Sequence, residues 1–343
     1  MGGEPVNKRI GVGVIGAGRI GRLHTENIAH RIPEARLVAI SDVSLEAAQK
    51  CAADFGVPAV EKDYHALLAN KEIDAVLICS STDTHARIMM DAAGQGKHIF
   101  CEKPIALDLP TIDKALEAVR KAGVKLQVGF NRRFDANNLR IRKLVEEGAI
   151  GEPHILRISS RDPAPPPMSY VKVSGGIFYD MTIHDFDTAR YLIGSEVEEV
   201  YTVAAVRVDP EIGAAGDLDT AIVTLRFANG VIGAIDNSRK AVYGYDQRAE
   251  VFGSKGMVQA ENLTPTATRV SGSEGVSADK PLFFFLERYM DSYCLEMREF
   301  VKCLQEGTEP KATGIDGRVS VQIAKAARLS YDQKRPVKVA EVG

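Results

Sequence analysis

The chain has 343 residues, of which 45% are hydrophobic and 26% are charged, and its formal net charge at pH 7 is −3. This length predicts two domains, and the absence of a basic excess argues against nucleic acid as a partner. The apolar runs are too short to span a bilayer and the first ten residues hold no apolar signal region, so we expect a cytoplasmic protein without a membrane partner.

The cysteines show neither a disulfide nor a metal pattern. No CxxC pair is present, and no cysteine is clustered with histidine. We therefore expect free thiols in a reducing compartment and no bound metal. The five residues are Cys51, Cys79, Cys101, Cys294 and Cys303.

A glycine-rich turn follows the first strand-like run of the chain. Residues 9–15 read RIGVGVI, and GAGRIG at 16–21 leads into a helical stretch. This order of strand, turn and helix is the setting of the G-x-G-x-x-G pattern that binds dinucleotides. Gly16 permits the turn, Gly18 lets the backbone approach a pyrophosphate, and Gly21 lets helix and strand pack closely. The predicted cofactor residues of this turn are Gly16, Gly18, Arg19, Ile20 and Gly21.

The next apolar run, at 36–42, ends in an acid. Asp42 lies at the distance from the glycines where a carboxylate accepts hydrogen bonds from the adenine-side ribose. A carboxylate there would repel a 2′-phosphate, which favours NAD over NADP. The alternative is that Asp42 caps the following helix, although Ser44 is the better candidate for that cap.

Strand-like and helical segments continue to alternate as far as residue 130. Alternation of this kind predicts a parallel, doubly wound α/β sheet of the Rossmann type, whose ligands bind at the carboxyl ends of the strands. We place this first domain at residues 1–128. The polar residues that follow its later strands, and that we assign to the cofactor, are Ser80, Ser81, Thr82, Glu102 and Lys103.

From about residue 151 the pattern changes to β-branched and alternating segments, and Asn229-Gly230 between two of them predicts a hairpin. We expect residues 129–343 to form an α+β domain with a mostly antiparallel open sheet. A free face of that sheet would cover the cleft or pair with a second subunit, which favours a homo-oligomer. An amphipathic helix is expected at 283–305, with its apolar stripe in a core.

The stretch GGIFYDMTIHDFD, at 175–187, carries the candidates for proton transfer. If it is helical, Asp180 and His184 share one face. A dinucleotide domain makes hydride transfer the default chemistry, and oxidation of an alcohol then needs a base and a donor for the oxygen. His184 is the natural base. Asp180 would orient it or bind a neighbouring hydroxyl, and Lys103 would assist the oxygen. The alternatives are a core histidine, a helix-capping aspartate and a solvated lysine.

These motifs resemble the glucose–fructose oxidoreductase/inositol dehydrogenase/rhizopine catabolism (Gfo/Idh/MocA) family over essentially the whole chain. The matching segments are GVIGAGRIGRLH at 13–24, the strand end at Asp42, CEKP at 101–104 and the stretch at 175–187. The long DMTIHDFD form, GFNRRFD at 129–135 and AVYGYDQRAEVFGSKG at 241–256 resemble the inositol 2-dehydrogenase branch.

The resemblance implies a catalytic triad of Lys103, Asp180 and His184, and a tetramer. It implies NAD-dependent oxidation of a cyclic polyol, with myo-inositol as substrate and 2-keto-myo-inositol as product. The T-P-x-x-H segment of the family is matched only in part by residues 82–85, because Asp83 replaces the proline. His85 is assigned to the cofactor on that match.

A polyol with a hydroxyl on every carbon needs many donors and acceptors around it. The substrate candidates are Arg133, Asp162, Tyr243 and Tyr245, with Asn131 and Gln247 as weaker ones. The alternative for Arg132 and Arg133 is pairing with acids at the domain junction. The alternative functions are a sugar or scyllo-inositol dehydrogenase with the same triad, and a non-enzymatic NAD-responsive binding protein, against which the intact triad argues.

Overall fold

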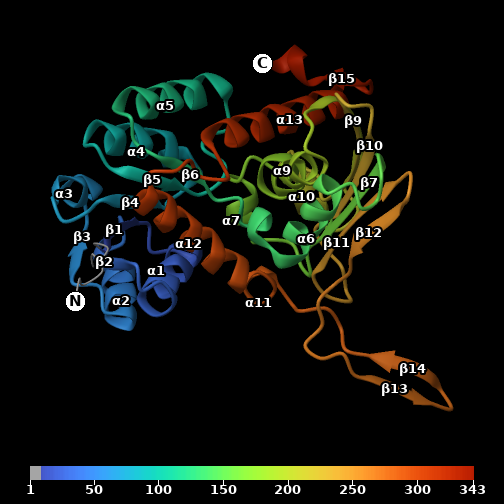
Figure 1. Cartoon of the computed structure of the whole chain (residues 1–343), viewed down its shortest axis with the longest axis horizontal. Helices are drawn as coiled ribbons and strands as arrows, with labels where there is room; N and C mark the ends of the chain where they lie inside the picture. The colour runs from blue at the N-terminus through green and yellow to red at the C-terminus, as the bar shows by residue number, and fades with distance from the viewer. Residues whose placement is uncertain (1–8) are drawn as a thin grey trace. The chain divides into compact units, whose positions relative to one another are not determined.

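The structure is a computed structural model, and it describes residues 9–343. The expectation that no signal region is present concerns the first eight residues in part, and these lie outside the described residues. The chain divides into two compact units, one made of residues 9–131 with 291–319 and the other of residues 132–290 with 320–343. Figure 1 labels the elements of both units.

The first unit contains a six-stranded sheet in the order β3-β2-β1-β4-β5-β6, and every neighbouring pair is parallel. The chain runs outward from β1 in one direction and then crosses back to β4, so the strand order reverses between β1 and β4. This is the doubly wound Rossmann order, and it confirms the predicted fold class. The strands are β1 Ile10–Ile15, β2 Ala35–Ser41, β3 Ala59–Glu61, β4 Ala75–Ile78, β5 His98–Cys101 and β6 Leu126–Val128.

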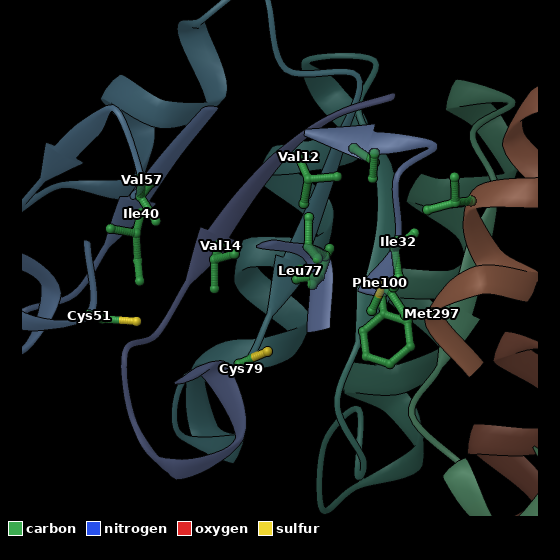
Figure 2. Close-up of a cluster of buried hydrophobic side chains, with 14 of the residues drawn as sticks. Val12, Val14, Ile32, Ile40, Cys51, Val57, Leu77, Cys79, Phe100 and Met297 are labelled. Atoms are coloured by element: carbon green, nitrogen blue, oxygen red, sulfur yellow. The ribbon is translucent and has the colours of Figure 1, made fainter. Parts of the chain in front are cut away.

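Helices connect these strands, and one helix from far along the sequence joins them. They are α1 Arg19–Arg31, α2 Leu45–Phe55, α3 Tyr64–Ala69, α4 Thr82–Gly94, α5 Leu109–Ala122 and α12 Met290–Glu306. Side chains of α1, α2 and α12 share one buried cluster with β1, β4 and β5. In Figure 2 Met297 of α12 lies beside Phe100 and Ile32 in this cluster.

The position of α12 differs from the predicted division of the chain, which placed residues 283–305 in the second domain as one helix. The structure has a short α11, Phe285–Arg288, and then α12, which from Asp291 onward belongs to the first unit. The reason is its apolar stripe: Met297 and Phe300 are fully buried, and the Phe300 ring lies 5.9 Å from the Phe100 ring. The stripe is in a core as expected, but the core is that of the first unit.

The second unit contains a seven-stranded sheet in the order β12-β11-β7-β10-β9-β8-β15. Strands β7 and β10 are parallel and the other pairs are antiparallel, as the mostly antiparallel prediction requires. The hairpin expected at Asn229-Gly230 joins β9 and β10. The strands are β7 Pro153–Arg161, β8 Val197–Ala205, β9 Thr220–Phe227, β10 Ile232–Ser238, β11 Asp246–Gly253, β12 Gly256–Ala260 and β15 Val337–Lys338.

One face of this sheet is packed and the other carries exposed apolar side chains. Along β9, Ala221, Val223 and Leu225 are buried, while Ile222 between the first two is exposed. Helix α9, Thr182–Ile193, packs against β7 and β10. The exposed apolar residues of the strands are Tyr201, Val203, Ile222, Ile232, Phe252 and Met257.

The remaining elements are short, apart from α6 and α13. They are η1 Asn131–Phe134, α6 Ala136–Glu146, α7 Met168–Val171, α8 Ile177–Asp180, α10 Pro210–Ala214, the exposed hairpin β13 Arg269–Gly272 and β14 Gly275–Ala278, α13 Gly314–Gln333 and η2 Val339–Val342. Over residues 9–343, none of the helices is long and apolar enough to cross a membrane.

Candidate active site

Two of the three glycines of the G-x-G-x-x-G turn are required by contacts within the protein. Gly16 has φ +103°, and a Cβ there would lie 2.6 Å from the carbonyl group of Cys79. A Cβ on Gly21 would lie 1.9 Å from the carbonyl oxygen of Gly16, so α1 could not approach the turn this closely. These are the turn and packing roles expected for the first and third glycines.

Among residues 9–343, no contact requires a glycine at position 18. Its backbone is extended, with φ −69° and ψ −170°, and a Cβ there would meet nothing within 4 Å. Gly18 is the N-cap of α1, so the amide groups of the first turn, which includes Arg19 and Ile20, point out of the helix end. An open space at a helix N-terminus fits the pyrophosphate of a dinucleotide.

Asp42 joins the end of β2 to the glycine-rich turn. Its Oδ2 accepts a hydrogen bond from the Ala17 amide at 2.7 Å, and its Oδ1 accepts one from the Ser44 amide at 2.8 Å. The cap of α2 is Ser44, whose hydroxyl accepts from the Ala47 amide. Asp42 is therefore not the helix cap that was its alternative, and its contact with a ribose stays a prediction.

The polar residues after β4 form the start of α4. Ser81 is the N-cap of this helix and Thr82 is its first residue. The Ser80 hydroxyl lies 2.6 Å from that of Thr84, and the Thr84 hydroxyl also donates to the carbonyl oxygen of Ser81. The three residues assigned to the cofactor thus lie together at a helix N-terminus and at the carboxyl end of a strand.

The loop that carries Lys103 is held on both sides by buried histidines. Glu102 is buried, its Oε1 lies 2.8 Å from His24 Nε2, and a Cβ on Gly129 would come within 2.8 Å of its Oε2. His85 Nδ1 lies 2.8 Å from the carbonyl oxygen of Pro104, and its Nε2 lies 3.0 Å from that of Ser80. His85 thus links the end of β4 to the loop after β5.

Burial lowers the pKa of His85, which favours the neutral ring in this position. A neutral imidazole has one N–H, so it donates to one of the two carbonyl oxygens. The Glu102 and His85 side chains fix the Lys103 loop, and their direct contact with the cofactor stays a prediction.

In the second unit, Gly175 and Gly176 both have positive φ, of 84° and 86°. A Cβ on Gly176 would lie 2.5 Å from Oδ1 of Asp217, and the same oxygen accepts a hydrogen bond from the Ile177 amide at 2.9 Å. The two glycines therefore form a tight turn against Asp217 at the start of α8.

The single helix assumed for Asp180 and His184 is interrupted. Asp180 ends α8, Met181 follows, and His184 lies in the first turn of α9. The His184 amide donates to the carbonyl oxygen of Met181, three residues back. Both residues therefore lie at the junction of α8 and α9.

Asp180 and Asp162 share one buried arginine, Arg239. Its Nη1 donates to Asp180 Oδ2 at 2.9 Å and lies 3.6 Å from Asp162 Oδ2. The Tyr170 hydroxyl donates to the other oxygen of Asp180 at 2.8 Å. Burial is the main cause that raises the pKa of Asp162 to about 6, while Arg239 opposes that rise.

Sequence reasoning did not single out Arg239. Its position follows from the strand register. Strands β7 and β10 are parallel, Ser238 pairs with Arg161, and Arg239 and Asp162 are the residues that directly follow these two strands. This pairing joins strands that are far apart in the sequence, so no local pattern indicates it.

Arg132 and Arg133 pair with acids of α9, as their alternative stated. Arg133 donates through Nε and Nη2 to the two oxygens of Asp187, at 2.8 and 2.6 Å. Arg132 donates to Asp185, whose other oxygen accepts from Asn237 at 2.8 Å. All four charged side chains are buried.

The remaining substrate candidates have different surroundings. Tyr245 is buried against Phe284 and Tyr289, and both Asp162 and Arg132 act on its hydroxyl electrostatically. The Tyr243 hydroxyl is more exposed and contacts Arg161 and Asp246. The Gln247 side chain donates a hydrogen bond to the Ser160 hydroxyl and accepts one from the Tyr289 hydroxyl.

The assigned residues fall into two sets. The first unit holds the cofactor residues, Lys103 and Asn131, and the second unit holds Asp180, His184, Arg133, Asp162, Tyr243 and Tyr245. Within the second unit the structure brings together Asp162, Asp180 and the hydroxyl of Tyr170 around Arg239, with Tyr245 near Asp162. Among residues 9–343, no group of three or more His, Cys, Asp or Glu side chains is placed to hold a metal ion.

Both units match described protein families. Residues 10–130 match the family described as "Oxidoreductase family, NAD-binding Rossmann fold", and residues 138–259 match the "GFO/IDH/MocA C-terminal domain". Myo-inositol 2-dehydrogenase of Thermotoga maritima is 51% identical over 96% of this chain and 99% of its own length. Inositol 2-dehydrogenase of Rhizobium meliloti is 44% identical over 96% and 98%.

Two similar solved structures contain ligands. The scyllo-inositol dehydrogenase of Lactobacillus casei with bound NAD(H) and scyllo-inositol has a TM-score of 0.91 and 31% identity, and covers 97% of this chain and 100% of its own. The myo-inositol dehydrogenase of the same species in complex with NAD(H) and myo-inositol has a TM-score of 0.86 and 27% identity, and covers 96% of each chain.

Gly18→Ala should weaken NAD binding without unfolding the protein. The backbone angles of Gly18 suit any residue and a Cβ meets no protein atom, whereas the Cβ would stand where a pyrophosphate must approach. We expect the Kd for NAD, measured by calorimetry, to rise about tenfold or more with an unchanged melting temperature. Gly21→Ala is the matched control, because its Cβ collides with Gly16 and should lower the melting temperature. An unchanged Kd in Gly18→Ala would contradict the role of Gly18.

Proposed function

Because the chain belongs to the Gfo/Idh/MocA oxidoreductase family with an NAD-binding Rossmann fold, we propose that it oxidises myo-inositol to 2-keto-myo-inositol with NAD. The observation that carries this proposal is the similarity, over nearly the whole of each chain, to two inositol 2-dehydrogenases. A cyclic polyol also suits the polar residues gathered in the second unit.

The first unit would bind the cofactor. NAD supplies the acceptor for the hydride when it is bound. The open N-terminus of α1 at Gly18 would hold its pyrophosphate, and the carboxylate of Asp42 would accept from a ribose hydroxyl. The rigid loop around Lys103, held by His24 and His85, would present the lysine to the substrate.

The proton chemistry is assigned to Lys103, Asp180 and His184. His184 would accept the proton of the reacting hydroxyl at its imidazole, since a histidine exchanges protons near neutral pH. Lys103 would donate a hydrogen bond to the oxygen on which negative charge develops. Asp180, whose two oxygens are already oriented by Tyr170 and Arg239, would fix the geometry of the site.

The remaining hydroxyl groups of the substrate would be bound by Asn131, Asp162, Tyr243 and Tyr245. Asn131 supports this role, because it is 2% exposed and its Nδ2 has no hydrogen-bond partner in the described part of the chain. A buried donor of this kind favours a ligand that accepts its hydrogen bond. Arg133 is a weaker candidate, since its Nε and Nη2 are engaged by Asp187.

A scyllo-inositol dehydrogenase is the second candidate. A scyllo-inositol 2-dehydrogenase of Bacillus subtilis is 36% identical over 95% of this chain, and the Lactobacillus casei structure binds that isomer. The two inositols differ in the orientation of one hydroxyl group, so the same acid, base and lysine would serve both. A binding protein without catalysis is disfavoured, because it has no need of a base beside a carboxylate.

The purified protein should reduce NAD in the presence of myo-inositol, and more slowly with other cyclitols and hexoses. Absorbance of the reduced cofactor measures the rate. Lys103→Ala should lower kcat about 100-fold, the usual scale for a group that stabilises charge on a reacting oxygen. Turnover with scyllo-inositol alone would favour the second candidate, and no turnover with any member of the panel would rule out the enzyme.

Asp42 should set the preference for NAD over NADP. Asp42→Ala should raise the KM for NAD about tenfold by loss of the ribose hydrogen bonds, and should weaken discrimination against NADP. Asp42→Asn is the control, because it removes the charge and keeps an acceptor for one of the two amides, those of Ala17 and Ser44, that Asp42 binds. An unchanged ratio of kcat/KM for the two cofactors in both variants would refute the ribose role.

The exposed apolar face of the seven-stranded sheet supports a homo-oligomer, which we propose is a tetramer. Tyr201, Val203 and Ile222 lie on adjacent strands and remain exposed in the single chain. Ile222→Asp should reduce the mass measured by light scattering, whereas Leu295→Asp, an exposed position on α12, should not. A monomeric wild-type protein would contradict the proposal.

The thiols support a reducing compartment. All five cysteines are unpaired and buried. We therefore propose that the protein acts in the cytoplasm, which cell fractionation would test.

A further inference from the structure

Arg239 is a buried cation with an unusual set of partners. It is 2% exposed and directly follows β10. Its Nη1 donates to Asp180 Oδ2 at 2.9 Å and lies 3.6 Å from Asp162 Oδ2, so two acids from different elements meet at one nitrogen. Its Nε and Nη2 are buried and have no hydrogen-bond partner among residues 9–343.

This geometry differs from that of the structural ion pair in the same unit. Arg133 engages one acid, Asp187, with two parallel hydrogen bonds through Nε and Nη2. That fork is the strongest arrangement that an arginine and a carboxylate can form. Arg239 instead makes no bidentate pair, and only its Nη1 is shared between Asp162 and Asp180. The arrangement therefore does not give the strongest possible ion pair.

The backbone around the three residues is fixed by other bonds. The Asp162 amide donates to the carbonyl oxygen of Ser238 at 2.9 Å, as the parallel pairing of β7 and β10 continues past their ends. The Arg239 amide donates to the carbonyl oxygen of Asp219 at 2.8 Å. The Tyr170 hydroxyl holds the second oxygen of Asp180. The three side chains can therefore keep their places without a bidentate clamp.

The charges around the cluster are not balanced one to one. Asp162 faces Arg239, Arg132 and Asp180, and Arg239 also faces Asp217. Tyr245, which directly precedes β11, also interacts electrostatically with Asp162. Burial and the Asp180 charge raise the pKa of Asp162, whereas the two arginines lower it. The charge of Arg239 thus acts on both carboxylates at once.

We propose that Arg239 is a positioning residue of the oxidation reaction: it holds Asp180 ionised and oriented, and keeps Asp162 beside it as a second acid. This inference rests on the proposed function, because it gives Arg239 a part in that reaction. Arg239 acts through the two aspartates, and no contact between Arg239 and substrate is needed.

The test compares Arg239→Gln, Arg239→Lys and Asp162→Asn with the wild-type protein. Loss of the cation removes the charge that stabilises both carboxylates, so Arg239→Gln should move the acidic limb of the kcat/KM profile to higher pH by about one unit or more. Loss of the neighbouring negative charge removes a repulsion from the Asp180 carboxylate, so Asp162→Asn should move that limb to lower pH. Arg239→Lys should restore much of the wild-type profile, and the KM for NAD should stay within about twofold in every variant.

Arg190→Gln is the matched control. Arg190 is another buried arginine of the second unit, and it pairs through two bonds of 2.7 Å with Glu196 and lies 4.0 Å from Asp187. Its loss should lower the melting temperature without moving the pH profile. If Arg239→Gln fails to fold, the opposite shift in Asp162→Asn remains a test of the same coupling.

A second readout does not depend on turnover. In protein labelled with ¹³C-aspartate, the carboxyl resonance that disappears in Asp162→Asn identifies Asp162, and its titration midpoint should lie higher in Arg239→Gln or Arg239→Lys than in the wild type, most in the former. Unmoved titrations and unmoved pH profiles would overturn the inference. An inactive wild-type protein with shifted titrations would refute the proposed function and leave the acid coupling standing.

Discussion

A charge that is removed from water must be met by an opposite charge, and this constraint organises the second unit. Arg132, Arg133 and Arg239 are all buried, and their partners Asp185, Asp187 and Asp180 all lie within eight residues of one another on α8 and α9. Breaking a buried pair of this kind costs about 3–5 kcal/mol, because it leaves an uncompensated charge inside the protein. The segment that carries the candidate base is therefore held by electrostatics as well as by packing.

Local patterns in the sequence were enough to predict the first unit's sheet and its cofactor turn. The glycine pattern, the acid at the end of β2 and the alternation of strands and helices each depend on residues that are close in sequence. The same holds for the Asn229-Gly230 hairpin. In each case the backbone geometry is decided by a few neighbouring residues, such as the positive φ of Gly16 and of Gly230.

Two features that could not be predicted depend on contacts between distant segments. The apolar stripe of α12 identified a core-facing helix but not the core that receives it, since Met297 and Phe100 are far apart along the chain. Arg239 meets Asp162 only because β7 and β10 are parallel neighbours. The sequence of 175–187 showed the acid and the histidine, but not the interruption of the helix at Met181 between them. Residue type and spacing thus indicated the chemistry, and tertiary pairing determined its geometry.

The late return of α12 to the first unit has a consequence for biosynthesis. Residues 9–131 leave the ribosome early, but one side of their hydrophobic cluster is completed by Met297, Phe300 and Val301. The dinucleotide unit therefore cannot finish folding until almost the whole chain has been made, and a fragment that stops at residue 131 would expose Phe100 and Ile32 to solvent. Folding of the first unit thus depends on a segment that is synthesised after most of the second unit. The nucleotide-binding unit therefore cannot be expressed alone as a fragment that ends at residue 131.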